Sequence, residues 1–307
     1  MFEHTTILGA GVIGASWASL FLASGRSVAV YDPSPDAESS VKAYVENAWP
    51  VLEQLGLTTH GNPDNLTFHQ SPTDAVANST FIQESVPEQI ELKHELFKQI
   101  EAAMPADAVI ASSASGLTLS EMQGGWNDPK ALVLGHPFNP PHLIPLVEVM
   151  GNDKTADGIV EKAQAFYKAV GKVTIRVNKE VPGHVANRLQ AAVWREAIHM
   201  VSTGVASVED VDTAMWAGPG LRWSVMGPTM LFHLGAGEGG LEEFCNRYTD
   251  SFNRWWDDLG ELHLNPEISA ELVNGVNAEA NGVPGEELAA KRDAMLAAVI
   301  NATAKMR

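Results

Sequence analysis

The first 32 residues constrain the fold more than any other part of the chain. An apolar segment over 5–8 leads into a G-x-G-x-x-G pattern, Gly9-Ala10-Gly11-Val12-Ile13-Gly14. Helix-forming residues continue to Ala23, and a second apolar segment over 27–31 ends in Asp32. A strand, a glycine turn, a helix, a strand and an acidic residue within about 30 positions are typical of a dinucleotide-binding βαβ unit. The alternative is a glycine-rich turn in another α/β fold, with Asp32 a solvated residue.

Each glycine of this pattern predicts a feature of a dinucleotide site. Gly9 permits the tight turn, Gly11 lets a pyrophosphate approach the backbone, and Gly14 lets the helix pack close to the sheet. The helix N-terminus offers free N–H groups to the phosphates. Asp32 would accept hydrogen bonds from the ribose and repel a 2′-phosphate, so we predict NAD rather than NADP. The predicted cofactor contacts here are Gly9, Gly11, Val12, Ile13, Gly14 and Asp32.

The composition is that of a globular enzyme. The 307 residues are 45% hydrophobic, which suffices for two domains, and carry a net charge of −18, which disfavours nucleic acid and anionic membranes as partners. No apolar run has the length of a membrane span, and no basic leader with a cleavage site precedes the first strand. Cys245 is the only cysteine, so we expect neither an internal disulfide nor a thiolate metal cluster, and we predict no metal ligands. A cytoplasmic location is expected.

Strand-like and helix-like segments alternate through the first half of the chain. Helical patterns over 36–55, 88–103 and 155–169 separate apolar segments at 66–68, 80–83, 108–111, 132–135, 146–149 and 173–175. This alternation predicts an α/β Rossmann-type, doubly wound, mostly parallel sheet. Beyond Val181-Pro182-Gly183 the pattern is helical, which predicts an all-α C-terminal domain. The predicted domains are residues 1–182 and 183–307.

Four polar residues occupy positions where ligands bind in open α/β sheets, after strands or at the start of a helix. They are Ser115, His136, Glu148 and Asn187. His136 is the natural general base, because histidine exchanges protons near neutral pH. Glu148 lies in an apolar strand and needs a partner, which an imidazole N–H would supply. Ser115 and Asn187 would bind the alcohol or carbonyl oxygen. The alternative is that His136 is structural, that Glu148 faces solvent, and that Ser115 and Asn187 are only capping residues.

Over residues 4 to about 235 the chain resembles the L-3-hydroxyacyl-CoA dehydrogenase family. The segments that carry the resemblance are GAGVIG, IASSASGL, GHPFNPPHLIPLVEV and VPGHVANRLQ. The resemblance implies a Rossmann-type NAD domain followed by a helical domain that forms a homodimer. It assigns His136 as the catalytic base, Glu148 as its partner, and Ser115 and Asn187 as ligands of the substrate oxygen.

The same resemblance implies further residues at the cofactor site. Glu84 and Glu88 would lie near the nicotinamide end, and Ser112 and Ser113 would line the cleft. We therefore add Glu84, Glu88 and Ser113 to the predicted cofactor contacts.

Two segments depart from the members of the family that use CoA. Those members carry a lysine-rich helical segment after the second strand, whereas residues 33–70 here hold only Lys42 against five acidic residues. Residues 216–244 resemble the small-substrate branch, which includes L-carnitine dehydrogenases and the lambda-crystallin/L-gulonate 3-dehydrogenase group. Arg222 would bind a substrate carboxylate. An aromatic wall suited to a trimethylammonium group would be formed by Trp216, Trp223 and Phe138. The alternative is that Arg222 forms a salt bridge and that the tryptophans are core residues.

The sequence thus predicts NAD-dependent oxidation of the 3-hydroxyl of a small, CoA-free hydroxy acid such as L-carnitine or L-gulonate. The predicted substrate contacts are Phe138, Arg222 and Trp223. One alternative is a 3-hydroxyacyl-CoA dehydrogenase. Another, of a different class, is a non-catalytic NAD-binding protein like the lens crystallins of this lineage.

Overall fold

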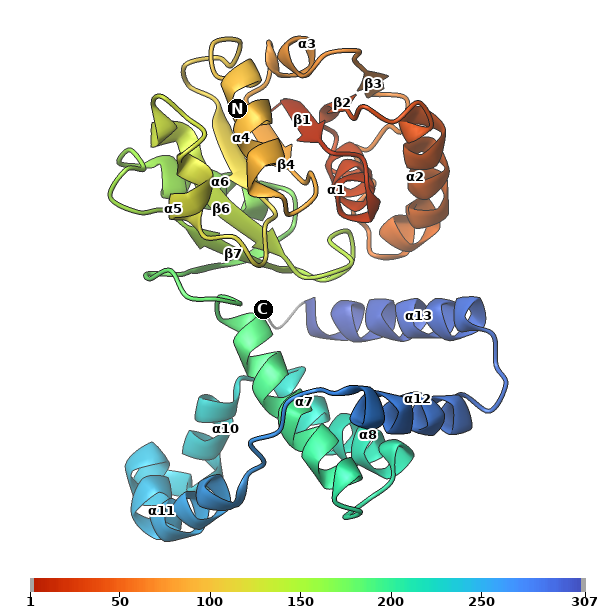
Figure 1. Cartoon of the computed structure of the whole chain (residues 1–307), viewed down its shortest axis with the longest axis vertical. Coiled ribbons are helices and arrows are strands. Elements are labelled where there is room, and N and C mark those ends of the chain that lie inside the picture. The colour runs from red at the N-terminus through yellow and green to blue at the C-terminus, as the bar shows by residue number, and fades with distance from the viewer. Residues whose placement is uncertain (1–2, 305–307) are drawn as a thin grey trace. The chain divides into compact units, whose positions relative to one another are not determined.

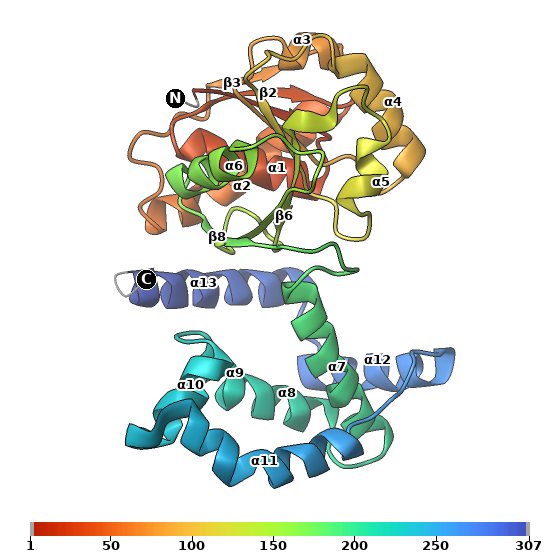
Figure 2. The same cartoon turned by 90° about the vertical axis from the view of Figure 1, so that its left-hand side faces the viewer.

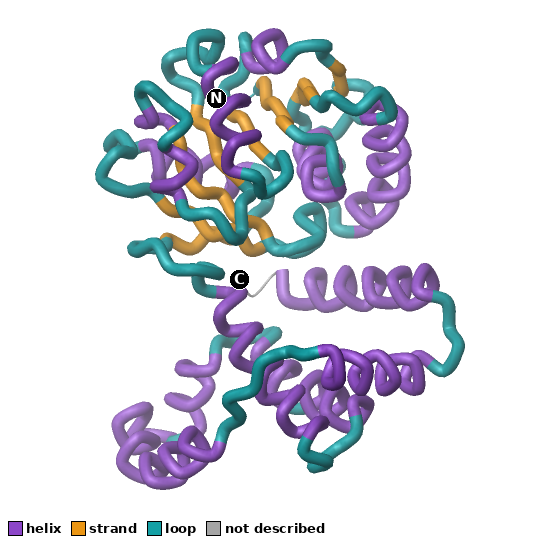
Figure 3. The backbone as a smooth tube through the Cα atoms, viewed as in Figure 1, coloured by secondary structure: helices purple, strands orange, loops and turns teal. Residues whose placement is uncertain are grey.

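A computed structural model describes residues 3–304, and the chain divides into two compact units between Ala186 and Asn187. All β-strands of the described residues lie in the first unit (Figure 3). The described part of the second unit consists of helices and loops. The predicted fold class, an α/β sheet followed by an all-helical part, is confirmed.

The first unit is built on one eight-stranded sheet with the strand order β3-β2-β1-β4-β5-β6-β7-β8. All neighbouring strands are parallel except β6 and β7, which are antiparallel. The order reverses direction at β1, and this switch point is where open α/β sheets bind ligands. The strands are β1 (His4–Leu8), β2 (Ser27–Tyr31), β3 (Leu66–Phe68), β4 (Phe81–Glu84), β5 (Val109–Ser112), β6 (Leu132–Pro137), β7 (Leu146–Met150) and β8 (Val173–Arg176).

Helices cover both faces of the sheet (Figure 1 and Figure 2). On one face lie α1 (Val12–Ala23), α2 (Ala37–Gln54) and α6 (Ile159–Ala169). Their apolar side chains form one core with the strands, in which Trp17, Phe21 and Phe166 are fully buried. On the other face lie α3 (Pro72–Val76), α4 (Ile90–Ile100) and α5 (Leu119–Gln123), which form a second core.

The βαβ unit at the start of the chain forms as its sequence predicts. Helix α1 begins after Gly11 and ends at Ala23, and Gly25, with φ of 81°, turns the chain toward β2. All residues of α1 from Gly14 onward are buried, because the helix lies between the sheet and α2. This explains why its sequence is apolar around its whole circumference.

Two short helices on the second face are absent from the sequence prediction, although their caps are local. Ser71 caps α3 through the backbone N–H of Asp74. Thr118 and Glu121 form a capping box at α5. Both helices have five residues, too few for a helical period to be recognised. A short 3-10 helix, Pro129–Ala131, precedes β6.

The second unit contains the helices α7 (Ala186–Ser202), α8 (Val208–Ala217), α9 (Pro219–Trp223), α10 (Pro228–Gly235), α11 (Gly240–Asp258), α12 (Pro266–Ala280) and α13 (Gly285–Ala304). A 3-10 turn, Gly237–Gly239, joins α10 to α11. Ser207 caps α8 by accepting a hydrogen bond from the Asp210 N–H, 3.1 Å away. In the part of the chain that the structure covers, no helix is long and apolar enough to cross a membrane.

Candidate active site

The carboxyl ends of several strands bring the sequence-predicted residues of the first unit to one edge of the sheet. The ladder continues past the strand ends, since the Ser85 N–H donates to Leu8 O at 2.7 Å and the Ser113 N–H to Glu84 O at 2.8 Å. The loops 9–11, 85–88 and 113–116 therefore start side by side. Because β7 is antiparallel to β6, the end of β6 and the start of β7 meet at the same edge.

The glycine loop has the shape that a dinucleotide requires. Gly9 has a φ of 92°, and a Cβ there would lie 2.7 Å from the backbone of Ser85 and Val86. A Cβ on Gly11 would contact nothing within 4 Å, so the backbone is open to a ligand at this position. No side chain caps α1, and its first turn holds no acidic residue. The loop residues therefore fit a pyrophosphate at the helix N-terminus.

The Asp32 carboxylate is fixed beside this loop. Its Oδ2 accepts a hydrogen bond of 2.7 Å from the Ala10 N–H, and its Oδ1 accepts one of 2.9 Å from the Ser34 N–H. Each oxygen retains a lone pair, which a ribose hydroxyl needs. The arrangement agrees with recognition of an unphosphorylated ribose.

His136 and Glu148 form a buried pair across β6 and β7. The two residues stand directly opposite each other in the antiparallel register, so their side chains share one face. His136 Nδ1 lies 2.8 Å from Glu148 Oε2, and the side chains are 7% and 0% exposed. Because a carboxylate only accepts hydrogen bonds, His136 carries its proton on Nδ1, and Nε2 presents a lone pair.

The other oxygen of Glu148 is also bound. Oε1 accepts hydrogen bonds of 2.9 Å from the N–H groups of Val185 and Ala186, where α7 begins. Burial by itself raises the pKa of Glu148. The hydrogen bonds from His136, Ala186 and Val185 outweigh burial and hold the pKa of Glu148 below its ordinary value. Glu148 is therefore an anion that orients the His136 ring.

Ser115 is held by Glu88 at the end of β5. The Ser115 hydroxyl donates to Glu88 Oε1 at 2.9 Å, and the N–H groups of Ser115 and Gly116 also donate to this carboxylate. Burial raises the pKa of Glu88, but these hydrogen bonds outweigh it and lower that pKa. In this structure the Ser115 hydroxyl proton is therefore directed at Glu88.

Glu84 makes contacts within the domain. It is fully buried and forms an ion pair of 2.6 Å with Lys93, which is itself 1% exposed. It also accepts hydrogen bonds from the Ser112 hydroxyl at 2.5 Å and from the Val86 N–H at 2.8 Å. These contacts join β4, β5 and α4, and a contact of Glu84 with cofactor stays a prediction.

Ser113 belongs to a polar network under the strand ends. Its hydroxyl oxygen lies 2.8 Å from Gln83 Nε2, 3.2 Å from Trp17 Nε1 and 2.9 Å from Ser85 Oγ. Tyr167 donates to Gln83 Oε1 at 2.7 Å. The network links α1, β4, β5 and α6, and so fixes the helix that carries the glycine loop relative to the site.

The loop that follows the candidate base His136 is held in place by the side chain of Lys172. Lys172 is buried, donates to the carbonyl oxygens of Pro141 and, at 2.7 Å, Ile144, and lies 5.2 Å from the centre of the Trp17 ring. Burial lowers the pKa of Lys172 to about 7. Phe138 begins this loop with its ring centre 6.4 Å from that of His136.

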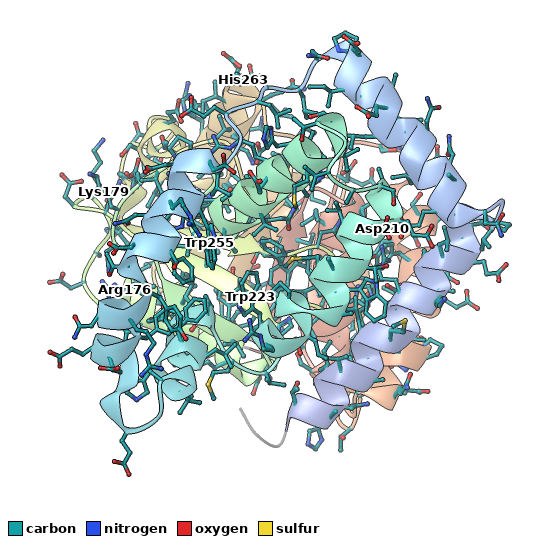
Figure 4. The ribbon with its side chains drawn as sticks, turned by 90° about the horizontal axis from the view of Figure 1, so that it is seen from below. Arg176, Lys179, Asp210, Trp223, Trp255 and His263 are labelled. Atoms are coloured by element: carbon teal, nitrogen blue, oxygen red, sulfur yellow. The ribbon has the colours of Figure 1, made fainter. Side chains whose placement is uncertain are left out.

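The other predicted site residues lie in the second unit, and their contacts with substrate stay predictions. Asn187 is half-buried near the start of α7. Arg222 is exposed on α9, and within residues 3–304 it has no salt bridge. Trp223, on α9 and labelled in Figure 4, is an exposed residue and not a core residue. Trp216 is exposed as well.

The sequence reasoning missed His184, whose ring centre lies 5.1 Å from that of His136. It is 3% exposed and belongs to the segment VPGHVANRLQ. The signal in the sequence is that a histidine, His184, stands only three residues before the predicted site residue Asn187. Within the described residues, no cluster of three or more His, Cys, Asp or Glu side chains could hold a metal ion.

Comparison with known proteins places this site in a family context. Residues 4–181 match the 3-hydroxyacyl-CoA dehydrogenase NAD binding domain, and residues 183–271 match the 3-hydroxyacyl-CoA dehydrogenase C-terminal domain. The chain is 46% identical to an L-carnitine dehydrogenase of Streptomyces coelicolor, covering 99% of this chain and 96% of that protein. It is 40% identical to one of Oceanobacillus iheyensis, covering 97% of each.

A solved structure has the same fold over nearly the whole chain. It is the NAD-dependent dismutase 5-formyl-3-hydroxy-2-methylpyridine 4-carboxylic acid 5-dehydrogenase, 28% identical, with a TM-score of 0.84 over 99% of both chains. A (S)-3-hydroxybutyryl-CoA dehydrogenase of Ralstonia eutropha is 25% identical, with a TM-score of 0.64 over 82% of this chain and 89% of that one.

Proposed function

Since the chain belongs to the 3-hydroxyacyl-CoA dehydrogenase family and is an NAD-dependent oxidoreductase, we propose that it oxidises the 3-hydroxyl of L-carnitine to the 3-keto acid. The buried His136–Glu148 pair supports the reaction, because it presents an oriented imidazole lone pair. This lone pair lies at the same edge of the sheet as the glycine loop. The near-full-length similarity to L-carnitine dehydrogenases supports the substrate.

The roles of the residues follow from their hydrogen bonds. His136 Nε2 takes the proton of the substrate hydroxyl, while Nδ1–H remains bound to Glu148, whose charge stabilises the imidazolium. Ser115 turns its own hydroxyl proton from Glu88 to the substrate oxygen, because the single proton of the substrate hydroxyl goes to His136. Asn187 binds the same oxygen. A bound NAD would supply the acceptor for the hydride that leaves the carbon carrying the hydroxyl.

A CoA-free substrate is supported by the charge around α2. Lys42 is the only lysine or arginine in residues 33–70, and its Nζ lies 2.5 Å from Glu38 Oε1. A CoA phosphate would meet net negative charge there. Arg222, exposed and free of salt bridges in the described chain, is available for the carboxylate of a small acid. Trp223 and Phe138 are proposed to face its trimethylammonium group.

An assay panel tests the function directly. Purified protein is incubated with NAD at alkaline pH and with L-carnitine, L-gulonate, 3-hydroxybutyrate or 3-hydroxybutyryl-CoA, and NADH absorbance is recorded. We expect the highest kcat/KM with L-carnitine. Preference for the CoA thioester would replace the proposed substrate, and activity with none of the four would favour a non-catalytic NAD-binding protein.

Substitution of Arg222 tests the proposed carboxylate contact. Arg222→Met is expected to raise KM for L-carnitine roughly 10- to 150-fold, because a charge-assisted hydrogen bond contributes about 1.5–3 kcal/mol. Arg222→Lys retains the charge and should recover part of this loss. NADH affinity, measured by fluorescence titration, serves as the control and should not change. An unaltered KM in Arg222→Met would remove this residue from the substrate site.

Substitution of Asp32 tests the cofactor contact. Asp32→Ala is expected to lower kcat/KM with NAD about 10- to 150-fold and to relax discrimination against NADP, because hydrogen bonds to a charged carboxylate are lost. Asp32→Asn is the matched variant, since its amide oxygen can still accept from the Ala10 N–H while the charge is gone. It should therefore gain NADP activity with a smaller loss of NAD activity. Equal wild-type efficiency with both cofactors would contradict this role.

We also propose that the protein is a cytoplasmic homodimer that associates through its second unit. The buried core of that unit is small, with Val201, Val208 and Val211 at its centre. Large apolar side chains such as Trp194 and Trp256 are exposed. Such exposure is typical of an interface. Light scattering of the purified protein tests the dimer, and a monomer at micromolar concentration would overturn it.

A further inference from the structure

His184 is held in the site by an unusual stretch of backbone. Its φ of 50° and the φ of 74° at Gly183 place two successive residues in the left-handed region. A histidine rarely adopts this conformation, and such strain tends to occur at functional sites. The turn directs the Val185 and Ala186 N–H groups at Glu148 and the His184 ring toward His136. The ring is therefore positioned by the same turn that fixes the partner of the base.

The contacts of His184 define where its proton lies. Nε2 lies 3.4 Å from the carbonyl oxygen of Ala114, which only accepts hydrogen bonds. The proton is thus on Nε2, and Nδ1 carries a lone pair. Nδ1 is buried and has no hydrogen-bond partner in the described structure. A buried acceptor without a donor is costly, so it points to a donor that arrives during the reaction.

The titratable groups that face His184 identify this donor. They are His136 on β6, Glu148 on β7 and Glu88 before α4. The two carboxylates have lowered pKa values and only accept hydrogen bonds. His136 has Nδ1–H committed to Glu148, so only its Nε2 can become a donor, when it takes the hydroxyl proton.

The spacing of the two rings suits this bond. Their centres are 5.1 Å apart with planes at 53°. No hydrogen bond joins the two rings in the structure, so the bond requires a small rotation of the His184 ring when Nε2 of His136 takes up its proton. Burial, together with the nearby His136, lowers the pKa of His184, which favours the neutral ring and keeps its Nδ1 lone pair available.

We propose that His184 is a positioning residue whose Nδ1 lone pair accepts a hydrogen bond from the protonated His136 ring and so stabilises the proton-bearing state of the reaction. The interaction exists only after the substrate hydroxyl has lost its proton. It therefore lowers the barrier without strengthening substrate binding. This inference rests on the proposed function, in which His136 is the base.

Three substitutions separate this role from simple packing. His184→Asn places an amide oxygen at the position of Nδ1 and tolerates the left-handed backbone. His184→Gln places its amide at the position of Nε2, and His184→Phe keeps a ring without nitrogens. We expect kcat with L-carnitine to fall about tenfold in the Gln and Phe variants and to recover largely in the Asn variant, with KM little changed.

Two further readouts belong to the same experiment. In the Gln and Phe variants the acid-side limb of the kcat profile for oxidation should move to lower pH, because the protonated base has lost a stabilising acceptor. Nitrogen-15 NMR of the wild type without substrate should show His184 neutral at pH 7, with its proton on Nε2. A proton on Nδ1 would overturn the proposal, as would an equal loss of kcat in all three variants or no loss in any. Absence of activity in the wild type would instead reject the proposed function.

Discussion

Replacement of His136 by Gln is expected to lower kcat roughly 10²–10⁴-fold, the usual contribution of general acid–base catalysis, while NADH binding remains near that of the wild type. A buried carboxylate orients the lone pair of His136 at this edge of the sheet. Steady-state kinetics with the best substrate of the panel and NADH fluorescence titration measure the two quantities.

A matched variant separates catalysis from stability. His136→Asn places an amide N–H near the position of Nδ1 and can still donate to Glu148, whereas the amide of His136→Gln lies farther out. Both variants lack the base and should lose activity equally. Only His136→Gln should also lose thermal stability, because it leaves a buried carboxylate short of a donor. A fall in kcat of less than about tenfold in both would remove His136 from the role of base.

Replacement of Glu148 by Gln is expected to slow turnover to a similar extent, roughly 10²–10⁴-fold. The N–H groups of Val185 and Ala186 require an acceptor, so the amide oxygen of the new side chain will turn toward them. The amide NH₂ then faces His136 Nδ1 and forces the imidazole proton onto Nε2. His136 Nε2 then already carries a proton and cannot accept one from the substrate, although every hydrogen bond of the buried pair is satisfied.

Acid titration provides the control for Glu148→Gln. The pKa of Glu148 is lowered in the folded protein, so its charge stabilises the fold above the ordinary carboxyl pKa, and this contribution is lost as the pH falls through the lowered value. Urea unfolding at a series of acidic pH values should therefore show a weaker pH dependence in Glu148→Gln. Unchanged turnover and an unchanged pH–rate profile would mean that Glu148 does not tune His136.

The βαβ unit and the order of elements are predictable from sequence because their signals are local. The glycine pattern, the apolar runs and Asp32 lie within one short segment, and each specifies its own backbone geometry. The closeness of His136 and Glu148 is also predictable, because a buried carboxylate requires a donor and few are available nearby.

Other parts of the site depend on contacts between distant residues, which the sequence pattern does not encode. The antiparallel direction of β7 follows from the path of the loop that joins it to β6, and an apolar strand has no direction in its pattern. The Glu84–Lys93 pair is buried by β5 and α4 together, so neither side chain differs from a surface residue in the sequence. His184 is brought to His136 by two left-handed residues in a turn.

The buried Lys172 amine links the pH preference of the fold to that of the reaction. Its pKa is about 7 in the folded protein against an ordinary value of 10.5, so between these values the unfolded chain binds a proton that the folded chain does not. Stability must then rise with pH over this interval. The neutral amine has two hydrogens for its two carbonyl acceptors, Pro141 and Ile144. Oxidation of a hydroxyl by NAD releases a proton, so alkaline conditions drive the reaction toward the keto acid. The same conditions leave Lys172 uncharged, so the pH range that favours oxidation is also the range in which burial of this amine costs the fold least.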